Sequence, residues 1–242
     1  MTSTPRRMLV IEPDAECGID QLAAPMHELG LRLETLRPWR GDEIPADVDH
    51  EALLILGGDM GANDIDEHPW ILDVRRLARA YVDADTPTLG ICLGGQILAT
   101  ACGGEVQRGD NDVEVGAIEI SWTADARSDV LVSQLPAPFT TGSWHRDAIT
   151  VLPPHAQLLG SSTRYPHQAF RVGRSAWGLQ FHPEVSLSGF RTWATHPEAG
   201  ADTSALHEGI DAFERAHATV RTHGRALGRA FARIVVGVPA PR

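Results

Sequence analysis

Two short segments of this 242-residue sequence carry side chains that could together perform nucleophilic catalysis. The first is Gly90-Ile91-Cys92-Leu93-Gly94, between an expected buried strand and an expected helix. Small residues two before and two after the cysteine allow a sharp turn that displays the thiol above the strand ends. The helix N-terminus favours the thiolate, the reactive form. The spacing predicts a nucleophile elbow, although a buried structural cysteine in a glycine-rich turn has the same local pattern.

The second segment, Gln180-Phe181-His182-Pro183-Glu184, ends another apolar run. A catalytic cysteine needs a base that takes its proton, and the base needs an acceptor that fixes its tautomer. Because His182 and Glu184 are two residues apart at a strand end, their side chains can lean toward one point. We therefore expect His182 to act as general base and acid and Glu184 to orient it, with a solvated pair as the alternative.

A pair of glycines, Gly57 and Gly58, follows the apolar run 53–56. Glycines at the carboxyl end of a strand leave backbone N–H groups free to line the crevice where open α/β sheets bind ligands. The N–H groups of Gly58 and Leu93 are expected to form an oxyanion hole for a tetrahedral intermediate. A simple tight turn is the other interpretation of these glycines.

The elements around these segments alternate in type. Apolar, β-forming runs at 8–12, 53–56 and 88–91, and a run of alternating polarity at 31–36, are interspersed with helical periodicity at 19–29 and 70–81. This alternation predicts an α/β fold with a doubly wound, mostly parallel sheet and helices on both faces. Short β-like runs at 113–122, 157–162, 168–172 and 176–181 predict a mixed β edge. Apolar residues at three-, four- and seven-residue intervals after residue 185 predict a C-terminal helical extension.

Composition excludes several function classes. The chain has 21 basic and 32 acidic residues, a net charge of −11, which disfavours a nucleic-acid binder. It contains no lysine, so a P-loop lysine and a Schiff-base lysine are impossible. Three cysteines without a CxxC spacing disfavour a disulfide scaffold or a thiolate zinc site. Its apolar runs are too short for a secretory signal or a membrane span, so we expect a cytoplasmic protein without a membrane partner.

The three segments together resemble the class I glutamine amidotransferases, in which Gly-Gly-Pro, G-x-C-x-G-x-Q and H-P-E motifs recur in this order. GICLGGQ at 90–96 and QFHPEV at 180–185 carry the resemblance, which is strongest to the amidotransferase domain of GMP synthase and its stand-alone relatives. It implies a flavodoxin-like fold. It also implies one domain over residues 1–242, with a core at about 8–185 and the helical extension at about 186–242.

The resemblance adds substrate contacts to the catalytic roles. Gln96, four residues past the nucleophile, is expected to contact bound glutamine, and SWHRD at 143–147 resembles the family loop that lies over the glutamine. Arg146 and Asp147 of this loop are therefore expected to bind substrate. The sequence departs from the family pattern at two positions: Asp59 stands where proline usually follows the two glycines, and Arg146 where glycine is frequent.

The reaction that the resemblance implies is hydrolysis of the γ-amide of L-glutamine. Cys92 attacks the amide, ammonia leaves with a proton from His182, and water hydrolyses the γ-glutamyl thioester. Neither a metal nor a cofactor is required. Because no SGGxDS-type ATP-pyrophosphatase loop occurs, we expect a stand-alone glutaminase that supplies ammonia to a separate acceptor or synthetase subunit.

Three other functions compete with this one. A γ-glutamyl peptidase or hydrolase would use the same triad on γ-glutamyl conjugates. The intact triad disfavours a non-catalytic binding module. A DJ-1-like protein is disfavoured because such elbows place histidine directly after cysteine, where this chain has Leu93.

Four further features are expected to be structural. Cys17 and Cys102 are interpreted as inert thiols, and His145 as a loop residue without a carboxylate at a useful spacing. The remaining feature is a basic stripe on the last helix, interpreted as a solvated face, with docking of an acidic partner as the alternative. This stripe consists of Arg221, Arg225, Arg229 and Arg233.

Overall fold

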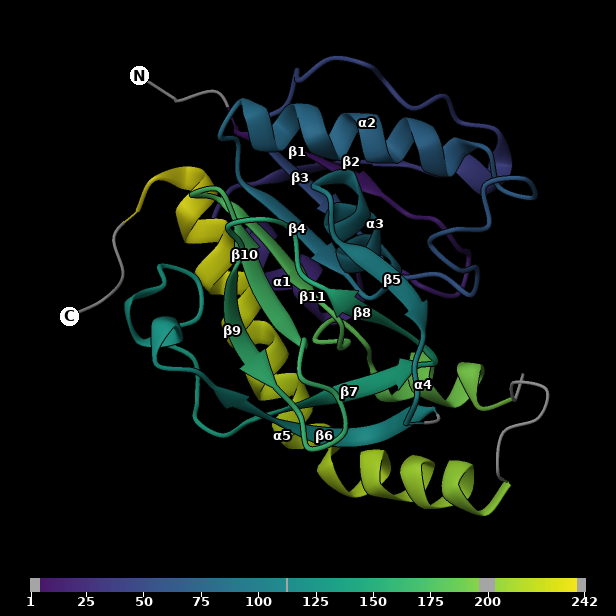
Figure 1. Ribbon diagram of the computed structural model, residues 1–242. Helices are drawn as coiled ribbons and strands as arrows, with labels where there is room; N and C mark the ends of the chain where they lie inside the picture. Colours follow the sequence, from purple (N-terminus) through teal and green to yellow (C-terminus); the bar gives the residue numbers. More distant parts are fainter. Residues whose placement is uncertain (1–4, 112, 196–202, 239–242) are drawn as a thin grey trace.

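The computed structural model describes residues 5–111, 113–195 and 203–238. Its main element is a nine-stranded sheet with the strand order β2-β1-β3-β4-β11-β10-β9-β6-β7 (Figure 1). The parallel half consists of β1 (Arg7–Ile11), β2 (Arg32–Leu36), β3 (Ala52–Ile55), β4 (Thr88–Ile91) and β11 (Ala176–Leu179). The connections contain α1 (Asp20–Glu28), η1 (Pro38–Arg40), α2 (Trp70–Asp83) and α3 (Leu93–Ala101). The doubly wound α/β fold with parallel strands and helices on both faces, predicted from the sequence, is confirmed.

Alternate residues of the central strands face opposite sides of this sheet. Met8 and Val10 of β1 belong to a core cluster with side chains of α1 and α5 (Thr203–Val236), whereas Leu9 and Ile11 belong to a cluster with side chains of α2 and α3. Figure 1 shows these helices on the sheet. Because helices cover both faces, neither set of residues meets water, and the strand sequence is an unbroken apolar run.

The other half of the sheet is antiparallel, as expected for the mixed edge. It contains β6 (Glu114–Trp122), β7 (Phe139–His145), β9 (Gln157–Ser161) and β10 (Ala169–Val172), with the short helix η2 (Asp125–Ser128) after β6. A separate two-stranded sheet pairs β5 (Glu105–Arg108) with β8 (Asp147–Val151).

Residues 143–147 do not form the loop that the sequence predicted. Residues Ser143 to His145 end strand β7, Asp147 begins strand β8, and only Arg146 lies between the two strands. Strand β7 is buried at five of its seven positions, because α5 packs across it. Its sequence therefore lacks the alternation of polar and apolar residues that identifies a half-exposed strand.

The predicted C-terminal extension is helical and consists of α4 (Leu187–Trp193) and α5. One stripe of α5 is buried, and it comprises Leu206, Phe213, Val220, Leu227 and Phe231. Two arginines of the basic stripe, Arg225 and Arg229, each bond a carboxylate oxygen of Glu28 on α1 at 2.8 Å. Part of the basic stripe therefore forms ion pairs with α1 of the same chain.

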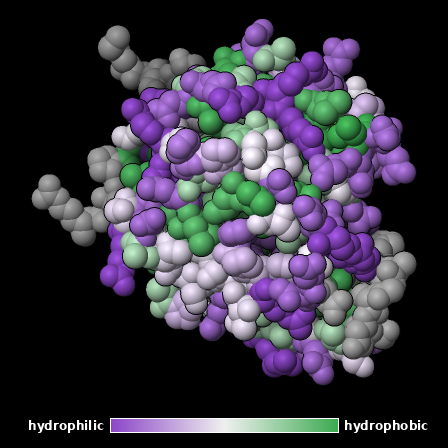
Figure 2. Space-filling model, in the orientation of Figure 1, coloured by the Kyte–Doolittle hydropathy of each residue, from purple (hydrophilic) through white to green (hydrophobic). Residues whose placement is uncertain are grey.

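Figure 2 shows polar residues over most of one face, with a small group of apolar residues near its centre. Within the described ranges, no helix is long and apolar enough to cross a bilayer.

Candidate active site

Cys92 occupies the elbow expected between β4 and α3. It directly precedes the first turn of α3 with φ +49° and ψ −109°, a conformation that residues with side chains rarely adopt. A Cβ atom on Gly90 would lie 2.4 Å from the carbonyl oxygen of Gly94, and one on Gly94 would lie 2.1 Å from that of Ile55. Both positions require glycine because backbone atoms approach so closely. The turn leaves the thiol at the carboxyl end of β4 and at the N-terminus of α3.

His182 and Glu184 follow β11, the strand that pairs in parallel with β4. The Cys92 N–H donates to the carbonyl oxygen of Leu179, the last residue of β11, at 2.8 Å, so the two strands end at the same level. Nδ1 of His182 lies 2.6 Å from Oε1 of Glu184. These two side chains are only 3% and 1% exposed. The structure thus brings the three predicted triad residues together.

Two opposing effects act on the imidazole of His182. Burial disfavours the charged ring, but the Glu184 carboxylate and the charge and hydrogen bond of Cys92 outweigh burial, so the pKa of His182 is raised well above its ordinary value. Since a carboxylate only accepts, Nδ1 donates to Glu184, and Nε2 is the nitrogen available to Cys92. The ring of Trp193 packs edge-on against the imidazole, with 4.7 Å between centroids.

The two residues of the expected oxyanion hole are neighbours. A Cβ atom on Gly58 would lie 3.0 Å from Cδ2 of Leu93. Neither backbone N–H of this pair donates to another group in the part of the chain that the structure describes. At the preceding position, a Cβ on Gly57 would lie 3.0 Å from Cε1 of His182, so a glycine here allows the imidazole to approach. Two unused amide donors therefore lie beside the thiol and the imidazole.

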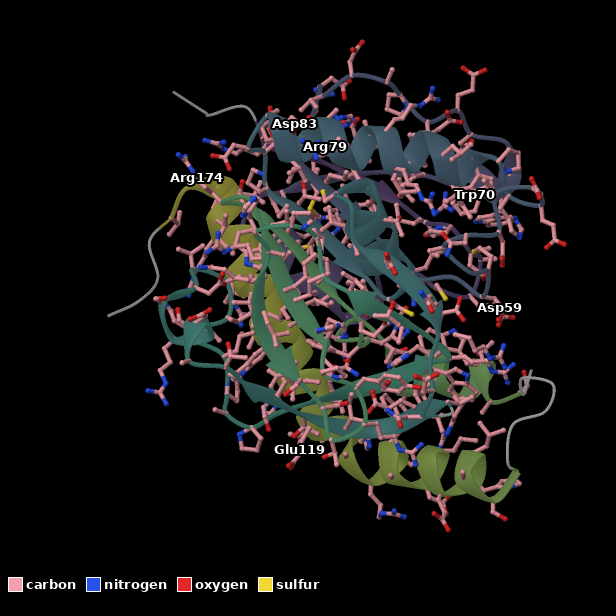
Figure 3. All side chains as sticks on the ribbon, viewed as in Figure 1. Asp59, Trp70, Arg79, Asp83, Glu119 and Arg174 are labelled. Atoms are coloured by element: carbon pink, nitrogen blue, oxygen red, sulfur yellow. The ribbon has the colours of Figure 1, made fainter. Side chains whose placement is uncertain are left out.

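A cleft of about 900 Å³ opens above these strand ends. Six of the eight predicted site residues line it: Gly58, Cys92, Gln96, Arg146, Asp147 and His182. Asp59 also lines the cleft, and its N–H donates to Asp14 Oδ2 at 3.4 Å, a bond that proline could not make. Figure 3 shows Asp59 at this end of the molecule and Asp83 and Arg174 at the opposite end.

Gln96 holds two parts of the site together. Its Nε2 donates to the backbone carbonyl oxygen of Asp147 at 3.0 Å and to Oε1 of Gln180 at 3.3 Å. Gln180 in turn donates from Nε2 to Cys92 Sγ at 3.8 Å. Sequence reasoning missed the role of Gln180, although it belongs to the QFHPEV motif. It also missed Trp193, whose place beside His182 depends on how α4 folds back.

His145 is not the loop residue expected from the sequence. It is the last residue of β7 and is 3% exposed, and its Nε2 lies 3.1 Å from Oε2 of Glu114 on β6. A carboxylate partner is supplied from 31 residues away in the sequence, because Glu114 is opposite His145 in the β6–β7 register. Gln168 donates to the same carboxylate oxygen at 2.6 Å.

The remaining cysteines have environments that suppress reactivity. Burial, followed by the charges of Asp14 and Glu184, strongly raises the pKa of the Cys17 thiol. Burial also raises the pKa of Cys102. Both thiols are therefore held in the protonated form, consistent with inert roles. Among the described residues, no three histidine, cysteine, aspartate or glutamate side chains are grouped as metal ligands.

The chain is similar in sequence to proteins of known family. The family model for glutamine amidotransferase class-I matches residues 19–194. The chain is 31% identical to a GMP synthase (glutamine-hydrolyzing) subunit from Methanococcus maripaludis over 146 residues, which cover 60% of this chain and 70% of the relative. It is also 31% identical to gamma-glutamyl peptidase 5 of Arabidopsis thaliana over 149 residues, 60% of this chain and 59% of the relative.

Solved structures show the same fold. A glutamine amidotransferase from Methylobacillus flagellatus is 25% identical and superimposes with a TM-score of 0.82, covering 99% of this chain and 98% of the other. A glutamine amidotransferase from Thermotoga maritima is 24% identical with a TM-score of 0.81, covering 95% of this chain and 99% of the other. The chain belongs to the class I glutamine amidotransferase family.

Proposed function

We propose that this protein hydrolyses the γ-amide of L-glutamine through the triad Cys92, His182 and Glu184. The observation that carries the proposal is the buried His182, bonded to Glu184 on one side and adjacent to the elbow cysteine on the other. The raised pKa of His182 supports it, because an imidazole that accepts a proton readily can take it from the thiol.

The groups around the triad supply each step of the reaction. The sulfur of Cys92 attacks the γ-carbonyl carbon, and the N–H groups of Gly58 and Leu93 stabilise the oxygen that becomes negative. His182 donates its proton to the departing ammonia, which leaves a γ-glutamyl thioester on Cys92. A water molecule, deprotonated by His182, then attacks the thioester and releases glutamate and the thiol.

The glutamyl end of the substrate is proposed to lie against Gln96, Arg146 and Asp147. All three line the cleft, and the bond from Gln96 to the Asp147 carbonyl joins α3 to the start of β8. We further propose that the chain acts as one unit, since α5 packs on β6 and β7 and its buried stripe completes the core. The ammonia passes to a separate synthetase subunit; the support is that several relatives are named as individual subunits of a GMP synthase.

Glutamine hydrolysis by the purified protein tests the proposal. We expect release of glutamate and ammonia, and alkylation of Cys92 by a glutamine-mimicking diazo-ketone. Cys92→Ser should reduce turnover by at least about 10³-fold, because a hydroxyl is a far weaker nucleophile in this position. Cys102→Ser is the matched control, since Cys102 lies at the other end of α3, and it should retain activity. Turnover that survives in Cys92→Ser would contradict the triad assignment.

A second candidate is hydrolysis of γ-glutamyl conjugates by the same triad. Glutamine has ten non-hydrogen atoms and needs about 300 Å³ if each occupies as much space as a liquid water, about 30 Å³. The cleft of about 900 Å³ therefore leaves room for a larger leaving group. The similarity to gamma-glutamyl peptidase 5 also favours this candidate.

The two candidates differ in substrate preference. We expect glutamine to be favoured over γ-glutamyl dipeptides by at least tenfold in kcat/KM, equivalent to about 1.4 kcal/mol of transition-state binding. Both substrates should be measured with the same enzyme preparation and with Cys92→Ser as the blank. A tenfold preference for a γ-glutamyl dipeptide would establish the second candidate in place of the first.

A further inference from the structure

A row of buried hydrogen bonds leads from strand β6 toward the nucleophile. At its far end, the Glu114 carboxylate accepts hydrogen bonds from Nε2 of Gln168 at 2.6 Å and from the hydroxyl of Ser162 at 2.7 Å. Nε2 of His145 lies 3.1 Å from the same carboxylate. The other nitrogen of the His145 ring, Nδ1, lies 3.0 Å from the carbonyl oxygen of Asp147. Because both ring nitrogens have oxygen partners, the orientation of His145 is fixed, and with it the position of the Asp147 carbonyl.

The row continues from Asp147 through two amide side chains. The Asp147 carbonyl accepts one N–H of Gln96, and Oε1 of Gln180 accepts at 3.3 Å from the same nitrogen. With its carbonyl held by Gln96, the Gln180 side chain directs its own NH₂ group at Cys92 Sγ, 3.8 Å away. Gln96 and Gln180 are 3% and 1% exposed, so water does not compete for these bonds.

Gln180 differs from Gln96 in its access to substrate. Gln96 lines the cleft, whereas Gln180 is not among the lining residues. The side chain of Gln180 instead bonds Gln96 and the sulfur of Cys92, and we expect it to act on catalysis through these two groups. An N–H donor stabilises negative charge on the sulfur and restricts its direction, and both effects favour attack.

We propose that Gln180 is a positioning residue that orients the Cys92 sulfur. Gln96 and the buried Glu114–His145 pair hold the Gln180 side chain in place. This inference rests on the proposed role of Cys92 as nucleophile. It connects Gln96 and Asp147, two of the residues proposed to contact the glutamyl group, with the reacting sulfur through the bonds of Gln96 and Gln180.

The first test needs no substrate. We expect Gln180→Met to slow alkylation of Cys92 by iodoacetamide at least fivefold at a fixed pH, with peptide mapping to separate Cys92 from the other two cysteines. Gln134→Met, the same change at an exposed glutamine, is the matched control and should react at the wild-type rate. A folded Gln180→Met protein that is alkylated at the wild-type rate would overturn the proposal.

A second variant keeps the test decisive if Gln180→Met does not fold. Gln96→Met removes the bond that holds Gln180, so it should also slow alkylation of Cys92. Where both variants fold, the double variant should be no slower than Gln180→Met alone, because both changes break one chain of bonds. Independent effects that multiply in the double variant would contradict a continuous chain.

Turnover provides a separate measurement. Gln180→Met should lower kcat for glutamine at least tenfold while KM stays within twofold, because Gln180 does not line the cleft. A change confined to KM would contradict a positioning role. If the wild-type protein hydrolyses no γ-glutamyl compound, the proposed function fails, whereas the alkylation comparison still decides the role of Gln180.

Discussion

The chemistry proposed for single residues depends on one buried imidazole. His182 is shielded from water by Trp193 and by the strands around it, and such burial alone would keep the ring neutral. Glu184 reverses this effect from 2.6 Å away, because it accepts the Nδ1 proton and stabilises the charged ring. In the proposed reaction, the ring then holds the proton that leaves Cys92 until ammonia departs.

Replacing Glu184 with glutamine should expose the effect of burial on the imidazole. We expect the pKa of His182 to fall, because the opposing carboxylate charge is lost, and kcat to fall by about 10²–10⁴-fold. An NMR titration of the imidazole and a glutamine turnover assay measure the two effects. Glu208→Gln, at an exposed position on α5, is the matched control and should change neither. An unchanged kcat in Glu184→Gln would contradict the orienting role of this carboxylate.

The raised pKa of His182 makes the free energy of unfolding depend on pH. The pKa of His182 is higher in the folded chain than its value of about 6.5 in the unfolded chain. Its contribution to the free energy of unfolding is therefore fully present below about pH 6.5 and is lost as the pH rises through the folded pKa. Urea unfolding at several pH values should show a smaller loss over this range in Glu184→Gln than in the wild type.

Elements differ in how well the sequence predicts them. The central strands β3 and β4 could be predicted because both of their faces are buried, so their sequences are short runs without charged residues, ALLI and TLGI. The elbow could be predicted because its requirements are local, within two residues of Cys92 on either side. Strand β7 could not, since its burial depends on α5, which lies more than fifty residues further along the chain.

Contacts between segments far apart in the sequence limit how much of the site could be predicted. Glu114 meets His145 only through the β6–β7 register, and Gln96 meets Gln180 across 84 residues. Neither spacing has a periodicity that a single sequence can reveal. The proposed triad could be predicted from the sequence because its motifs stand at two strand ends. The residues around it, Glu114, His145 and Gln180, could be connected to the site only from the folded structure.

At the scale of the whole molecule, α5 joins the core to the back of the site. Its C-terminal half inserts Leu227 and Phe231 into the cluster beneath the sheet. Toward its N-terminus, Phe213 stacks on Phe190 of α4 with 3.8 Å between ring centroids. Between these two contacts, Gly224 faces the backbone of Pro183, which lies between His182 and Glu184. This contact joins α5 to the segment that carries His182 and Glu184, and we expect the position of α5 to affect the geometry of the proposed triad.

Gly224→Ala tests this link. In an exposed helix the change would stabilise by about 1 kcal/mol, because alanine is the better helix former. Here a Cβ atom would lie 2.0 Å from the Pro183 carbonyl oxygen, which Gln21 also contacts at 2.9 Å. Overpacking of this kind costs about 1–3 kcal/mol, so we expect a net loss in the free energy of unfolding.

Glutamine turnover should fall in the same variant, because the methyl group displaces the backbone that carries His182 and Glu184. Thr219→Ala, at an exposed position of α5, introduces alanine without a clash and should leave both unfolding and turnover close to the wild type. If Gly224→Ala instead stabilised the protein and kept full turnover, α5 would not restrain the triad, and the extension would serve the core alone.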